Sequence, residues 1–352
     1  MKKLVPLLLL VLFPTACSRL SPPPSAENYY SWGLAHQARG DFSGAIILFT
    51  KAIELNKDFT AAYYHRGDAK QSQRDFTGAI ADYNLAIQNA PSFLMAYLGR
   101  GSAKQAESDF DGALADFNKV ISLSPQFGTA YICRGSLRQV RQDLRGAVED
   151  YDKAVEYSPQ FELGFIKRAG ANRLLKSFSA ALADYEQAVK LDETDAGGYN
   201  GRAIVKLVNA NFDGAFVDLQ QAIALAQTDR VRYYAHIYLW MTLAEQGRIP
   251  EAKRRLTDYL QNTQLHDPQL WMKTIAEFVL EKTDEATLLA AAKQGYSEVA
   301  VRGQTCEGWF FAGLKRRLAG DREKAADYFA KCIATNQIGY IEYLLAKAEL
   351  NR

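Results

Sequence analysis

The side chains that most often bind metal ions or act as nucleophiles are few and scattered in this sequence. The histidines are His36, His65, His236 and His266, and the cysteines are Cys17, Cys133, Cys306 and Cys332. Metal sites and nucleophilic centres need such residues at short spacings, and neither closely paired histidines nor Cys-x-x-Cys occurs. Gly-x-Ser-x-Gly and glycine-rich phosphate loops are absent too. We therefore expect no enzymatic activity, no metal ion and no cofactor.

A column of paired charges is the clearest chemical pattern. Arginine recurs every 34 residues, and an aspartate follows each arginine after sixteen residues. The pairs are Arg66 and Asp82, Arg100 and Asp116, Arg134 and Asp150, Arg168 and Asp184, and Arg202 and Asp218. Where Trp32 replaces the arginine, Leu48 replaces the aspartate. A row of arginines suits an anionic ligand, but the accompanying acids favour structural ion pairs between two helices.

These charges belong to a period of 34 residues that covers residues 26–229 in six copies. Small residues recur at positions 8 and 20, an aromatic ring at position 24 in five copies, and Asp, Ser or Asn at position 16. The residues at position 16 are expected to cap the second helix of each unit. A helix-turn-helix unit with this pattern resembles the tetratricopeptide repeat. The resemblance implies an all-α, right-handed solenoid of stacked helix pairs.

The register of the repeat changes near residue 229. Residues 230–337 are interpreted as three divergent units, the last of which begins at Cys306. Residues 338–352 form an amphipathic pattern that predicts a C-terminal capping helix. A solenoid needs such a cap to cover its last apolar face.

In tetratricopeptide proteins the first helix of each unit lines a concave groove. Mapped onto this chain, the groove residues are Tyr30, Gln37, Tyr64, Gln71, Leu98, Gln105, Ile132, Gln139, Ile166, Arg173 and Asn200. Such a neutral surface of amide, tyrosine and aliphatic groups suits a protein or peptide partner. A sugar polymer stays open as a ligand. Toward the middle of the array the surface becomes more apolar, with Leu163, Ile166, Leu174, Leu207 and Val208. Alternatively, part of this apolar stripe packs against an insertion or against the capping helix.

The first residues predict an address in the cell. Lys2 and Lys3 precede an apolar run at residues 4–13, which is shorter than the roughly 20 residues that span a bilayer. Pro14, Thr15, Ala16 and Cys17 resemble a bacterial lipobox, although the family favours leucine where Pro14 stands.

This resemblance implies a signal peptide at residues 1–16, a lipid on Cys17 and a proline-rich tether at residues 17–25. Ser18 resembles the sorting residue of outer-membrane lipoproteins, so we expect a lipid-anchored protein that faces the periplasm. Without Lys2 and Lys3 the 42 Lys and Arg become 40, equal to the 40 Asp and Glu. This balance argues against nucleic-acid binding.

The C-terminal third resembles the NlpI type of outer-membrane lipoprotein, through a short unit around Trp271 and a closing repeat before the last helix. The resemblance implies a non-enzymatic adaptor for cell-wall hydrolases or a periplasmic protease. An assembly lipoprotein of a secretion, type IV pilus or exopolysaccharide machine stays open.

The cysteines leave two interpretations. In an oxidising periplasm, Cys306 and Cys332 would form a disulfide if the antiparallel helices bring them together. Alternatively, Cys332 takes the place of a small core residue.

His65 occupies a position that holds Gly99 and Cys133 in other units, which favours a core role.

Overall fold

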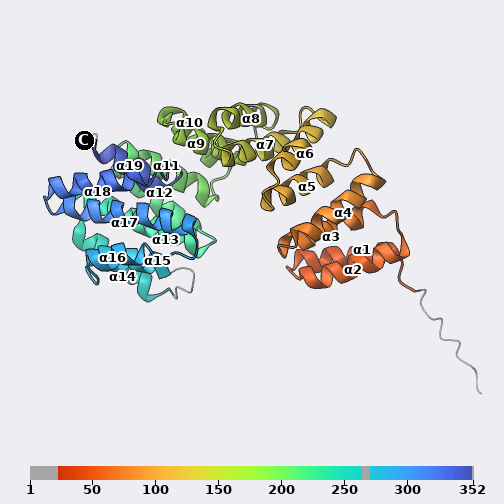
Figure 1. Cartoon of the computed structure of the whole chain (residues 1–352), viewed down its shortest axis with the longest axis horizontal. Coiled ribbons are helices and arrows are strands. Elements are labelled where there is room, and N and C mark those ends of the chain that lie inside the picture. Colours follow the sequence, from red (N-terminus) through yellow and green to blue (C-terminus); the bar gives the residue numbers. More distant parts are fainter. Residues whose placement is uncertain (1–22, 264–269, 351–352) are drawn as a thin grey trace, which may run out of the picture. The chain divides into compact units, whose positions relative to one another are not determined.

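The computed structural model describes residues 23–263 and 270–350, and all its regular secondary structure there is helical (Figure 1). Regular repeats supply α1 (Ala26–Ala38), α2 (Phe42–Leu55), α3 (Thr60–Ser72), α4 (Phe76–Asn89), α5 (Leu94–Ala106), α6 (Phe110–Leu123), α7 (Gly128–Val140), α8 (Leu144–Tyr157), α9 (Glu162–Leu174), α10 (Phe178–Leu191), α11 (Ala196–Val208) and α12 (Phe212–Leu225). Divergent units supply α13 (Asp229–Glu245), α14 (Ile249–Gln261), α15 (Leu270–Val279), α16 (Glu285–Ala291), α17 (Glu298–Leu318) and α18 (Arg322–Ala334), and α19 (Ile341–Leu350) follows. The chain divides into unit 1, residues 1–107, and unit 2, residues 108–352.

The second helix of each regular repeat begins at its expected capping residue. In five repeats the side chain accepts a hydrogen bond from the backbone amide three residues later, as Asn211 does from Gly214 at 2.9 Å. Ser177 is the exception, because it begins α10 without a side-chain cap. The expectation of six capping side chains was therefore wrong for this repeat.

This difference gives a matched pair of substitutions in unit 2. Asn211→Ala should lower the free energy of unfolding by about 1 kcal/mol, because the Gly214 amide loses its acceptor. Ser177→Ala removes no capping bond and should have an effect several-fold smaller. Urea denaturation followed by circular dichroism measures both, and equal losses would contradict this explanation.

Small residues allow the two helices of a repeat to pack closely. A methyl group placed on Gly135 of α7 would lie 2.7 Å from Cε1 of Tyr151 in α8, so only hydrogen fits there. The turn between these helices contains a residue in the left-handed region, with φ of 78° at Gly40 and 65° at Gln142. Among the six regular repeats, glycine occupies this turn in the first one alone, so the turn does not require glycine there.

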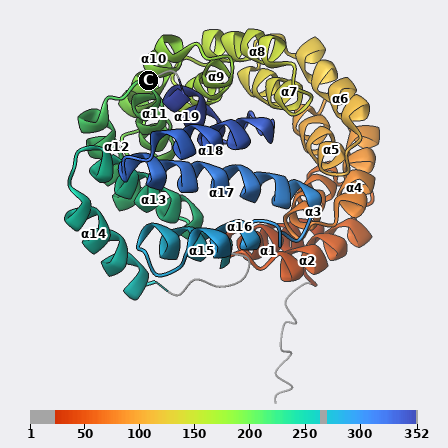
Figure 2. The same ribbon diagram turned by 60° about the vertical axis from the view of Figure 1, so that its left-hand side comes forward.

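The first helices of successive repeats form the inner layer of each unit. In unit 2, α7 contacts α9 and α9 contacts α11, while α8, α10 and α12 lie outside them (Figure 2). In unit 1, α1 contacts α3 and α3 contacts α5. The inner surface of each unit is therefore built from the helices that the sequence assigned to the groove.

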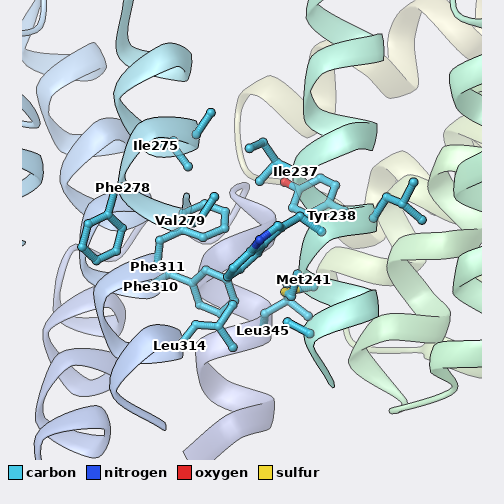
Figure 3. Packing of buried hydrophobic residues seen from close by; sticks show 14 of the residues in the cluster. Ile237, Tyr238, Met241, Ile275, Phe278, Val279, Phe310, Phe311, Leu314 and Leu345 are labelled. Atoms are coloured by element: carbon cyan, nitrogen blue, oxygen red, sulfur yellow. The ribbon is translucent and has the colours of Figure 1, made fainter. Parts of the chain in front are cut away.

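The divergent units and α19 share one large hydrophobic core inside unit 2. Side chains from α13, α15, α17 and α19 meet there, among them Tyr238, Phe278, Phe311 and Leu345 (Figure 3). Helix α19 also contacts α11, α17 and α18, so it lies on the inner side of the array (Figure 2). Helix α17 begins at Glu298, eight residues before Cys306, and the side chain of Ser297 caps its first turn. The expected start of the last unit was therefore wrong.

Candidate functional site

The arginine column forms ion pairs inside the repeats. Arg134 Nη2 lies 2.6 Å from Asp150 Oδ1, and the aspartate side chain is only 3% exposed. The same bidentate arrangement joins Arg66 to Asp82, Arg168 to Asp184 and Arg202 to Asp218. Arg100 belongs to unit 1 and Asp116 to unit 2, so their pairing stays a prediction. Because these guanidinium groups are engaged by acids, the structure favours a structural role for the column.

Four of these arginines have a second partner, which sequence reasoning missed. Arg134 Nη1 donates a hydrogen bond to Asn118 of the preceding repeat at 2.7 Å. Equivalent bonds join Arg66 to Thr50, Arg100 to Asn84 and Arg168 to Asp152. The sequence did contain a signal for these bonds, because position 25 of the repeat holds a polar residue in each of these cases. The arginine thus links the helices of one repeat and also links that repeat to its neighbour.

The inner face of unit 1 carries half-buried aromatic and polar side chains from α1, α3 and α5. Gln37 Nε2 donates to Asp68 Oδ2 at 2.5 Å, and Tyr83 donates to Gln71 Oε1 at 3.2 Å. The predicted groove residues Tyr30, Gln37, Tyr64, Gln71 and Gln105 are all partly exposed here. Leu98 is only 6% exposed and packs in the core, so its assignment to the groove was wrong.

The predicted surface of this face is neutral, but the structure places one acidic side chain, Asp68, among its tyrosines. The charge of Asp68 adds to burial in raising the pKa of Tyr64. Burial lowers the pKa of His65, whose ring lies against Tyr30, Phe49 and Tyr64. His65 is therefore a neutral member of an aromatic cluster, in agreement with its expected core role.

The inner face of unit 2 is partly covered by the chain itself. Ile132 is 5% exposed and belongs to the core, so it too was wrongly assigned to the groove. Leu207 and Val208 pack into the core that contains α19. The charge of Arg173 acts on Glu342 at the start of α19, and Asn200 has a buried Oδ1. Gln139 accepts a hydrogen bond from Tyr151 at 3.3 Å, and Ile166 packs partly buried near Tyr185.

The remaining histidines of the described chain lie apart from one another and contact aromatic or capping residues. Across residues 23–263 and 270–350, no group of three His, Cys, Asp or Glu side chains could hold a metal ion. His236 stacks on Tyr259 at 3.9 Å, and burial lowers its pKa to about 4. His36 contacts the capping residue Asp41 at 2.7 Å. Within the same ranges, no helix is both long and apolar enough to cross a bilayer.

Cys306 and Cys332 are buried thiols whose Sγ atoms lie 3.4 Å apart. Burial also raises the pKa of Cys133 to about 11. Exposing the folded protein to oxidised glutathione should leave Cys133 as the free thiol among these three, because the close pair can form a disulfide with little helix movement. Thiol alkylation after denaturation, followed by mass spectrometry, counts them. Three free thiols after oxidation would contradict the pairing.

Several predictions fall on residues that lie outside the described ranges. They are the signal peptide at residues 1–16, the lipidation of Cys17, most of the tether at residues 17–25, the last two residues of the capping helix at 338–352, and His266.

Residues 30–92 match the tetratricopeptide repeat family. Together with the repeated helix pairs, the solved structures of similar fold identify this protein as an all-α tetratricopeptide solenoid, and the predicted fold class is confirmed. The tetratricopeptide fold generally serves as a scaffold for protein–protein interaction.

The solved structures share the fold at low sequence identity. The Cut9–Hcn1 hetero-tetramer of APC/C is 18% identical with a TM-score of 0.54, and the match covers 62% of this chain and 43% of that one. Pseudomonas aeruginosa pilF is 14% identical with a TM-score of 0.51, covering 60% of this chain and 97% of that one. YrrB, a TPR protein with an unusual peptide-binding site, is 20% identical with a TM-score of 0.40, covering 53% and 96%. No curated protein matches the sequence significantly.

Proposed function

We propose that this protein is a lipid-anchored adaptor of the bacterial cell envelope that binds a polypeptide on the inner face of unit 1. The observation that carries the proposal is the contrast between the two inner faces. Tyr30, Tyr64 and Gln71 remain partly exposed in unit 1, while α19 packs against the inner side of unit 2. Partly exposed tyrosine and amide groups suit a peptide, because they contact apolar side chains and bond to its backbone.

The charges on this face favour a partner segment that carries lysine or arginine. Asp68 lies between the tyrosines, and Glu27 is exposed on α1. The groove residues predicted on α1, α3 and α5 include no Lys or Arg. A basic segment would therefore gain favourable electrostatic interactions, which increase the rate of association as well as the affinity.

The envelope location rests on the N-terminal pattern, which ends in Ala16 and Cys17. Acylated Cys17 would hold the protein at the outer membrane, facing the periplasm. Metabolic labelling with an alkyne palmitate tests this step, with Cys17→Ala as the matched variant. Labelled wild-type protein and unlabelled variant support the anchor, and labelling that persists in the variant overturns it.

Site-specific photocrosslinking in the native cells tests the groove. The probe replaces Gln105, on the inner helix α5, or Gln88, which is exposed on the outer helix α4 of the same unit. We expect a crosslink to a polypeptide from position 105 and none from position 88. Asp68→Asn should weaken this crosslink several-fold, because the variant keeps the shape of the side chain without its charge.

The crosslinked partner decides between two classes of adaptor. A cell-wall hydrolase or a periplasmic protease supports the adaptor that the resemblance to the NlpI type implies. A channel or pilus component would favour the assembly lipoprotein instead. Equal crosslinking from positions 105 and 88 would overturn the peptide groove.

A further inference from the structure

A cavity of about 320 Å³ lies between α13, α15 and α17 of unit 2. Its lining includes Tyr234, Trp271, Gln304, Glu307 and Tyr340. A second cavity of about 500 Å³ shares Trp271 and Gln304 with it. Sites for small molecules usually measure about 300–1,000 Å³ and combine aromatic walls with a few polar groups. The cavity has this size and composition.

A buried carboxyl group forms part of its wall. Glu307 is only 4% exposed, Tyr234 donates a hydrogen bond to its Oε1 at 3.1 Å, and Trp271 donates to its Oε2. Within the described chain no lysine or arginine forms an ion pair with Glu307. Burying an ionised carboxylate without a cation is costly, so a ligand that brings a positive charge to Glu307 would stabilise its ionised form.

A positive charge stands at the entrance of the same cavity. Arg230, in the first turn of α13, is exposed and lines the cavity. Its charge also acts on the hydroxyl groups of Tyr234 and Tyr340, which places it beside the aromatic walls. The cavity thus presents an acid inside, aromatic rings around it and a guanidinium group outside.

We propose that this cavity binds a free α-amino acid, with its ammonium group at Glu307 and its carboxylate at Arg230. Aromatic faces attract an ammonium group, and the rings of Tyr234, Trp271 and Tyr340 supply such faces. A guanidinium group binds a carboxylate through two parallel hydrogen bonds. A ligand with one charge alone would leave Glu307 or Arg230 without a partner. The side chain of the amino acid would extend toward the second cavity.

The proposal has a consequence for pH. Burial, followed by the charge of Glu342, raises the pKa of Glu307 to about 8. Pairing with an ammonium group requires the ionised carboxylate, so affinity should rise with pH through the range in which Glu307 loses its proton, which lies above the usual range of a glutamate. The other titratable groups around Glu307 are Tyr233, Tyr234, Tyr238, Tyr340, Glu342, Cys306 and Cys332, with the charged Arg230. Burial raises the pKa values of the tyrosines, so they stay neutral in this range.

Isothermal titration calorimetry on the full chain in detergent tests the site with alanine, lysine and phenylalanine. Ethylamine and propionate serve as probes that carry one charge each. We expect at least one amino acid to bind, and both single-charge probes to bind at least tenfold more weakly. Glu307→Gln keeps the shape of the side chain and should weaken binding at least tenfold. Arg230→Gln, at an exposed position where folding is not at risk, should do the same.

Arg302→Gln is the control, because Arg302 is exposed on α17 and does not line the cavity. It should leave the affinity unchanged. The proposal is overturned if no amino acid binds at millimolar concentration, if ethylamine binds as tightly as alanine, or if Arg230→Gln has no effect. These outcomes do not depend on photocrosslinking at position 105, so the two proposals fail separately.

Discussion

Arg134→Ala should lower the free energy of unfolding by about 3 kcal/mol, and Arg168→Ala by more, up to about 5 kcal/mol. Removing one partner of a buried ion pair leaves the other charge uncompensated, which usually costs about 3–5 kcal/mol. After Arg134→Ala, Asp150 still contacts Arg138 at 3.1 Å. Asp184 has no second basic contact in the described chain, because Asn172 stands where Arg138 does. The repeat that lacks this second base therefore suffers the larger loss.

Arg141→Ala is the matched control for these two variants. Arg141 pairs with Asp111 at 2.9 Å, but the side chains are 46% and 89% exposed. Such surface pairs contribute about 0–1 kcal/mol. Chemical denaturation measures all three variants, together with partner crosslinking from position 105. If the Arg134→Ala variant is as stable as the wild type but no longer crosslinks to the polypeptide partner, the arginine column binds a ligand.

Leu345→Ala should lower the free energy of unfolding of unit 2 by about 2–5 kcal/mol, although it lies near the end of the chain. Its side chain is 4% exposed and packs with α13 and α17 in the large core (Figure 3). Replacing a buried leucine by alanine removes apolar contacts and leaves a cavity. Limited proteolysis and thermal denaturation should both show the loss.

Leu350→Ala is the control on the same helix, because Leu350 is 43% exposed. Surface substitutions of this kind usually change stability by less than about 0.5 kcal/mol. If Leu345→Ala is as mild as Leu350→Ala, α19 is a loosely attached cap and the inner face of unit 2 would open to partners.

The repeated part of the fold could be predicted because each copy repeats the same local physics. The small residues at two positions and the capping side chain recur in each copy and can be read directly from the sequence. The contacts within each helix pair and between successive pairs then follow from the 34-residue period. The second acceptor of the arginines escaped notice, because Asn118 is recognised as a partner only when the packing of adjacent repeats is known.

The cavity of unit 2 could not be predicted from the sequence. Glu307 meets Tyr234 from 73 residues away and Trp271 from 36 residues away, and neither separation follows the period. The burial of Leu98 and Ile132 depends on how tightly the inner helices pack, which position in the repeat alone does not determine. The position of α19 depends on a core that forms only when several units meet.

Because the hydrophobic core is divided so unequally, the two ends of the array should open at different free energies. Unit 1 has small separate clusters between its repeats, while α13 to α19 share one core. Backbone amides of α1 to α4 should therefore exchange with deuterium sooner than those of α13 and α17. A polypeptide bound to unit 1 would slow hydrogen exchange in α1 to α4, because a ligand stabilises the folded state to which it binds. In such a protein, binding of the partner and local folding of unit 1 would be coupled in a single equilibrium.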